Sequence, residues 1–141
     1  MSRHDIARSG GQLAHDQLIA SATRRPEAPA VIGEATHTWA DLDRASDALA
    51  ARLQAEGVRR GDRVAVMADN SAEVVVAMYA ALKAGGVFVV VNPTTKPAKL
   101  AYILGDCEVR AMVAHQRVAR FVLPALAESP SVTTTVWVGG V

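Results

Sequence analysis

The sequence predicts an α/β fold in which repeated β-α-β units build a parallel sheet. In the second half of the chain, apolar strand-like runs alternate with helical segments, which is the pattern of a parallel sheet covered by helices. The runs at 64–68 and 87–91 are apolar at every position, as expected of strands that are buried on both faces. Half of the 141 residues are hydrophobic, which is enough for one compact core.

Residues 1–26 are expected to hold a first helix, and residues 27–60 a hairpin followed by a second helix. Apolar residues recur at helical spacing before Pro26, and a proline disfavours helix in the residue that precedes it. Two short runs of β-prone residues flank Gly33, which favours a turn between two antiparallel strands.

The second helix has sequence signals at both ends. Thr38 and Asp41 form an imperfect capping box, in which the threonine hydroxyl can accept a hydrogen bond from a first-turn amide. Gly57 suits the left-handed position that follows a helix. Apolar residues every three to four positions predict one inward-facing stripe, made of Leu42, Ala45, Leu49 and Leu53.

Residues 61–141 are expected to contain the β-α-β repeats. The expected strands are 64–68, 87–91, 109–114 and 133–138, and the helices between them begin near Ala72, Pro97 and Gln116. Residues 74–82 are all apolar or aromatic, so their helix has no polar face and is expected to be buried on all sides. A four-stranded unit of this size covers one face well, and the sequence therefore predicts an incomplete domain.

The apolar stretch 74–91 is long enough to suggest a membrane span. Lys83 in its middle, the glycine pair that follows and the β-branched second half argue against a span and favour a buried helix followed by a buried central strand. Lys83 then lies in the last turn, where a lysine complements the helix dipole. At the start of the same helix, Asn70 with Glu73 predicts an N-cap.

Composition excludes several classes of function. The formal net charge is +1 and the charges are interspersed, so the chain has no basic stripe for nucleic acid. Cys107 is the only cysteine, and no Cys or His pair has metal-ligand spacing. The first residues lack the apolar core of a signal peptide, which together with the single cysteine predicts a cytoplasmic location. The histidines are scattered without evident partners: His4, His15, His37 and His115.

Four segments are informative as sequence motifs, in addition to their helix and strand propensities. They are 38–42 (TWADL), 61–64 (GDRV), 82–93 (LKAGGVFVVVNP) and 99–107 (KLAYILGDC). In order and spacing these segments resemble the first core motifs of the adenylate-forming (AMP-binding) superfamily, which contains acyl- and aryl-CoA ligases, luciferases and nonribosomal adenylation domains. The resemblance implies that residues 1–141 are an incomplete N-terminal part of the family's large domain.

The resemblance implies a parent enzyme that activates a carboxylic acid with ATP as an acyl-adenylate and transfers it to a thiol. ATP, Mg²⁺ and coenzyme A are the cofactors that it implies for the parent, and none is expected to bind this chain alone. Asn92-Pro93 is more similar to the acyl- and aryl-CoA ligases than to the amino-acid-activating domains. Some of these ligases carry a basic residue just after that pair, whereas Thr94 and Thr95 follow it here. Lys96, the next residue, is the candidate for coenzyme contact, and the alternative is a solvated lysine before a helix.

The residues that carry the family's chemistry are absent from the sequence. There is no Ser/Thr/Gly-rich phosphate loop ending in lysine, and no dinucleotide, Walker or nucleophile-elbow motif, so no catalytic residue is assigned. Two alternatives to the CoA-ligase interpretation stay open: a fragment of a nonribosomal adenylation domain, and a short non-catalytic binding or assembly module on the same scaffold. Uncovered apolar surface would favour self-association of the isolated chain.

Overall fold

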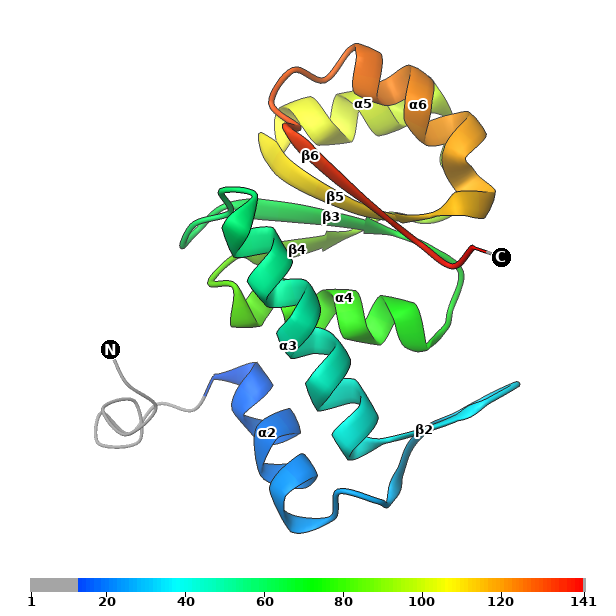
Figure 1. Cartoon of the computed structure of the whole chain (residues 1–141). Helices are drawn as coiled ribbons and strands as arrows, with labels where there is room; N and C mark the ends of the chain where they lie inside the picture. The colour runs from blue at the N-terminus through cyan, green and yellow to red at the C-terminus, as the bar shows by residue number, and fades with distance from the viewer. Residues whose placement is uncertain (1–12, 141) are drawn as a thin grey trace.

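The computed structural model describes residues 13–140, which form a four-stranded parallel sheet and a separate two-stranded hairpin (Figure 1). The strands are β1 (Pro29–Ile32), β2 (Thr36–Thr38), β3 (Arg63–Met67), β4 (Val87–Val90), β5 (Val109–His115) and β6 (Thr134–Val138). The helices are α2 (Ala14–Arg24), α3 (Trp39–Ala55), α4 (Ala72–Lys83), α5 (Pro97–Asp106), α6 (Ala119–Ala127) and the short 3₁₀ helix η1 (Gln116–Val118). The predicted α/β class with β-α-β units is confirmed. Predictions for residues 1–12, including His4, lie outside the described residues.

Helices cover the two faces of the sheet as separate layers. In Figure 1, α3 and α4 lie on one side of the sheet and α5 and α6 on the other. The order of the strands is β4-β3-β5-β6, all parallel. Along β3 the side chains alternate, because Val64 and Val66 join the core under α3 and α4 while Ala65 and Met67 join the core under α5 and α6. The prediction of a strand buried on both faces is therefore correct for β3.

The prediction for β4 is wrong. The uniformly apolar run predicts a central strand covered on both faces, yet β4 is one of the two edge strands of the described sheet and pairs only with β3. Val87 and Val90 are 51% and 53% exposed as a result. An apolar strand sequence predicts that both faces of the strand need to be buried. It does not predict the position of that strand in the sheet.

The N-terminus of α3 confirms the predicted capping box. Thr38 Oγ1 accepts a hydrogen bond from the Asp41 amide at 3.1 Å, and Asp41 Oδ2 accepts one from the Thr38 amide at 2.9 Å. The backbone hydrogen bond from Thr38, followed by the bond to the Thr38 side chain and that to Arg44, lowers the pKa of Asp41 below its ordinary value of 3.8. The carboxylate form therefore closes this end of the helix.

The predicted stripe on α3 is only partly correct. Leu42 and Leu53 are buried, but Ala45 is exposed, and Ser46 and Ala50 take the other buried positions. The apolar pattern does not predict a buried Ser46, because its side chain is polar. Its Oγ donates a hydrogen bond to the Leu42 carbonyl at 2.7 Å, which lets the hydroxyl be buried.

Lys83 joins α4 to α3. Its Nζ lies 2.7 Å from Asp43 Oδ1, 2.7 Å from Asp47 Oδ1 and 2.8 Å from Ser46 Oγ, and its side chain is 7% exposed. The lysine lies in the last turn of α4 as predicted, but its ammonium binds side chains of a neighbouring helix, which the interpretation as a dipole partner did not anticipate.

The outer surface of α4 is only half covered. Ala77, Ala80 and Ala81 are buried, whereas the larger apolar residues are half-buried: Val74, Val75, Val76, Met78, Tyr79 and Leu82. Among the described helices, none combines the length and the apolar character that crossing a membrane requires.

Candidate functional site

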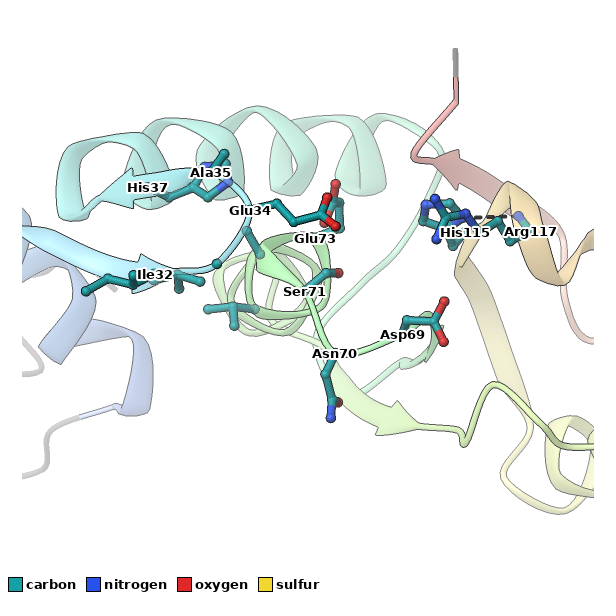
Figure 2. A pocket seen from close by; sticks show the side chains of 14 residues that line it. Ile32, Glu34, Ala35, His37, Asp69, Asn70, Ser71, Glu73, His115 and Arg117 are labelled. Atoms are coloured by element: carbon teal, nitrogen blue, oxygen red, sulfur yellow. Dashed lines mark hydrogen bonds between the residues drawn. The ribbon is translucent and has the colours of Figure 1, made fainter.

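A cavity of about 630 Å³ lies at the carboxyl edge of the parallel sheet (Figure 2). Open α/β sheets bind ligands at this edge, where the connections that follow the strands meet. Three segments form the wall: the tip of the β1–β2 hairpin, the connection from β3 to α4, and the end of β5 with η1. The polar residues among those that line it are Glu34, His37, Asp69, Asn70, Ser71, Glu73, His115 and Arg117.

The connection from β3 to α4 differs from its prediction. Ser71, not Asn70, is the N-cap of α4, and its side chain makes no capping hydrogen bond. The carboxylate of Glu73 instead accepts from its own backbone amide, which is the main reason that the pKa of Glu73 is lowered below 4.5. The Ser71 hydroxyl lies near enough to contribute to this lowering, yet it makes no hydrogen bond of standard geometry to any described residue.

The histidines are less isolated than the sequence indicated. His115 Nδ1 accepts a hydrogen bond from the Arg117 amide at 3.1 Å, so Nε2 is the ring nitrogen left to donate. That nitrogen faces Gly139, where a Cβ atom would meet the His115 ring. His37 and His115 also favour the charged form of Glu73. His15 likewise has an interaction within the structure.

The cavity is polar and mixed in charge. Glu34, Asp69 and Glu73 provide acids, whereas His37, His115 and Arg117 provide groups that are or can become cationic. Among residues 13–140, no three His, Cys, Asp or Glu side chains are placed to hold a metal ion. The Ser71 hydroxyl has no hydrogen-bond partner of standard geometry among the described residues. The arrangement of acids and cations can orient a polar group.

Lys96 is not part of this cavity. It is the exposed N-cap residue of α5, and its Nζ lies 5.4 Å from the centroid of the Phe121 ring. The guanidinium of Arg120 lies 4.7 Å from the same centroid. Sequence analysis missed Arg120 and Phe121, which belong to α6 and are distant in sequence from Lys96. One available signal was the lack of any Asp or Glu in 115–127.

Comparisons with known proteins agree with the fold and the motifs. A family model described as AMP-binding enzyme matches residues 18–140. The chain is 42% identical over 90 residues to the isonitrile lipopeptide synthase of Mycobacterium tuberculosis, an alignment that covers 63% of this chain and 4% of that protein. It is 35% identical over 83 residues to the acyl-CoA ligase sidI of Aspergillus fumigatus, covering 59% of this chain and 14% of the ligase.

Among solved structures, the anthranilate CoA ligase AuaEII in complex with anthranoyl-AMP superposes with a TM-score of 0.86 at 26% identity. The superposition covers 94% of this chain and 26% of the ligase. The chain thus spans a small part of the length of the relatives it matches. Its parallel sheet matches the N-terminal domain of adenylate-forming enzymes, and with a family model that extends over almost all described residues, the chain belongs to the AMP-binding enzyme family.

Proposed function

We propose that this chain is the N-terminal part of the large domain of an ATP-dependent acyl- or aryl-CoA ligase. The observation that carries the proposal is the superposition on an anthranilate CoA ligase over 94% of the chain. Asn92-Pro93 supports the same choice. In such an enzyme a carboxylic acid would be activated as an acyl-adenylate and passed to the thiol of coenzyme A. In this proposal the chain contributes the parallel sheet against which the rest of the large domain packs.

The described residues differ in how well they fit the groups that this activity needs. Mg²⁺ does not fit, because no cluster of described acids or histidines could ligate it. The phosphates of ATP do not fit either, because the sequence holds no phosphate loop. Coenzyme A does fit one position: Lys96 is exposed, cationic and placed at the start of α5, where it could hold an anionic part of the coenzyme.

A nonribosomal adenylation domain is the second candidate. The 42% identity to an isonitrile lipopeptide synthase and the 36% identity to tyrocidine synthase 2 of Brevibacillus parabrevis favour it. The two candidates share adenylate formation and differ in the thiol acceptor, which is free coenzyme A in one and a carrier-bound thiol in the other. A cytoplasmic location is part of both proposals.

Pyrophosphate exchange tests the scaffold role. We expect the isolated chain to show no ATP–pyrophosphate exchange with any carboxylic acid. A chimera in which residues 18–140 replace the matching part of the anthranilate CoA ligase should fold and catalyse exchange with anthranilate. Exchange by the isolated chain would contradict the view that the site lies elsewhere. A chimera that unfolds cooperatively but catalyses no exchange would contradict the scaffold role.

Light scattering separates this proposal from a self-sufficient binding or assembly module. The exposed edge of β4 and the half-covered surface of α4 should make the isolated chain self-associate, because unpaired strand edges and contiguous apolar surface favour association. We expect the scattering mass to rise with protein concentration. A constant monomer mass with a sharp thermal transition would favour the module instead.

A further inference from the structure

His115 closes the start of a helical segment at the carboxyl edge of the sheet. It is the last residue of β5 and the N-cap residue of η1, which leads directly into α6. Its ring nitrogen Nδ1 accepts a hydrogen bond from the Arg117 amide at 3.1 Å (Figure 2). This amide belongs to the first turn, where the helix itself provides no acceptor. The imidazole ring therefore takes the place of the oxygen that caps most helices.

A cap of this kind depends on the protonation state of the ring. Neutral imidazole has one nitrogen that accepts a hydrogen bond, whereas imidazolium has N–H donors on both nitrogens. A proton on Nδ1 would point at the Arg117 amide, which is also a donor, and would place a positive charge beside the Arg117 side chain. Histidine changes its charge between about pH 5 and pH 8, a range in which a serine or threonine cap is unaffected.

The cavity beside the ring offers the protonated form another position. Acids from three elements line this cavity of about 630 Å³: Glu34 of the hairpin tip, Asp69 before α4, and Glu73 on α4. Attraction between His115 and Glu73 already contributes to the lowered pKa of Glu73. The other groups in the cavity that are or can become cationic are Arg117 on η1 and His37 on β2. A charged ring is therefore repelled from η1 and attracted by the acids near α4.

Gly139, which follows β6, holds the neutral ring at its cap position. A Cβ atom at this residue would coincide with the His115 ring, and Gly139 has a φ of +60°. A second cavity of about 450 Å³ lies on this side, and it shares His115 and Arg117 with the first. Movement of the ring would therefore change the wall between the two cavities.

We propose that His115 is a proton-sensitive switch at the carboxyl edge of the sheet. The neutral ring caps η1 and packs on Gly139. The protonated ring releases the Arg117 amide and turns toward Glu73 and Asp69, so that acid loosens the start of η1 and reshapes both cavities. The switch depends only on groups within the described residues, and the proposed function can fail without affecting it.

Proton and nitrogen NMR of the chain between about pH 5 and pH 8 tests the switch. The Arg117 amide resonance should shift with the same midpoint as the His115 ring. Its protection from hydrogen exchange, corrected for the intrinsic rate at each pH, should fall about fivefold in acid, because one hydrogen bond is lost. A nuclear Overhauser contact between the His115 ring and the Glu73 side chain should appear only in acid. The Asp41 amide, which Thr38 Oγ1 caps, is the internal control and should keep its protection.

Two variants separate the cap from general effects of acid. In His115→Asn the side-chain oxygen can cap η1 at every pH, so the titration of the Arg117 amide should disappear while its protection remains. In His37→Gln, the matched control on the hairpin, the titration should persist. An Arg117 amide that does not titrate in the wild type, that still titrates in His115→Asn, or that stops titrating in His37→Gln would overturn the proposal.

Gly139→Ala is expected to reproduce the released state without a proton. The added Cβ atom displaces the His115 ring, so at neutral pH the Arg117 amide should take the shift and the reduced protection that the wild type shows in acid. Gly140→Ala is the matched control, because the nearest atoms to a Cβ atom there belong to the flexible side chain of Gln116. Wild-type behaviour of the Arg117 amide in Gly139→Ala, or an equal effect of Gly140→Ala, would contradict a cap held in place by the end of β6.

Discussion

Gly86→Ala is expected to lower the free energy of unfolding by about 3 kcal/mol, the upper end of the usual cost of overpacking. A Cβ atom at Gly86 would lie 2.9 Å from the Asp62 carbonyl oxygen and 3.3 Å from the Ala81 carbonyl oxygen. Both carbonyls are already engaged, because Asp62 O accepts from the Val87 amide and Ala81 O accepts from the Gly86 amide. Backbone atoms held in this way cannot move aside as a flexible side chain can. Urea unfolding of the isolated chain measures the effect.

Gly105→Ala is the matched control for this substitution. Gly105 lies within α5 and has no positive φ, and a Cβ atom added there would meet no other atom within 4 Å. Alanine there should stabilise the chain by up to about 1 kcal/mol, because glycine is a poor helix former. A loss below about 0.5 kcal/mol for Gly86→Ala, comparable to an ordinary surface change, would show that the turn into β4 relaxes and that the close approach is not required.

The features of the fold that the sequence predicts correctly depend on residues that are close together in the sequence. The Thr38–Asp41 capping box joins groups three positions apart, and the pattern of buried β3 repeats every two residues. Such features follow from local geometry. The edge position of β4 was not predictable in this way, because strand order depends on how the crossovers place each strand, not on the composition of β4 itself.

The candidate site was less predictable for the same reason. Lys96 could be named from its place after Asn92-Pro93, but its ring partner Phe121 lies 25 positions later on another helix. The spacing of Asn70 and Glu73 predicts a helix cap, whereas the fold places Glu73 near His37 from the hairpin and His115 from β5. These residues come together only when separate helices and strands pack against one another. Their spacing in the sequence therefore does not predict the contacts.

Lys83→Met is expected to destabilise the chain by about 2 kcal/mol. Its three donors are matched by Asp43 Oδ1, Asp47 Oδ1 and Ser46 Oγ, and Ser46 in turn donates to the Leu42 carbonyl. Methionine keeps the apolar stem but leaves the two carboxylates close together without their cation. Breaking a fully buried pair costs roughly 3–5 kcal/mol. The expected loss is smaller because the Asp43 and Asp47 side chains are 26% and 56% exposed, so water screens part of the effect.

A set of variants distinguishes this ionic network from general loss of a surface lysine. Lys99→Met, on an exposed position of α5, should change the free energy of unfolding by less than about 0.5 kcal/mol. Asp43→Asn should cost more than Asp47→Asn, since Asp43 is the less exposed partner. In the double variant Lys83→Met with Asp43→Asn, the loss should be smaller than the sum of the single losses, because both changes remove the same interaction. Additive losses would contradict coupling between the two residues, and a Lys83→Met loss no larger than that of Lys99→Met would mean that the network does not hold α3 against α4.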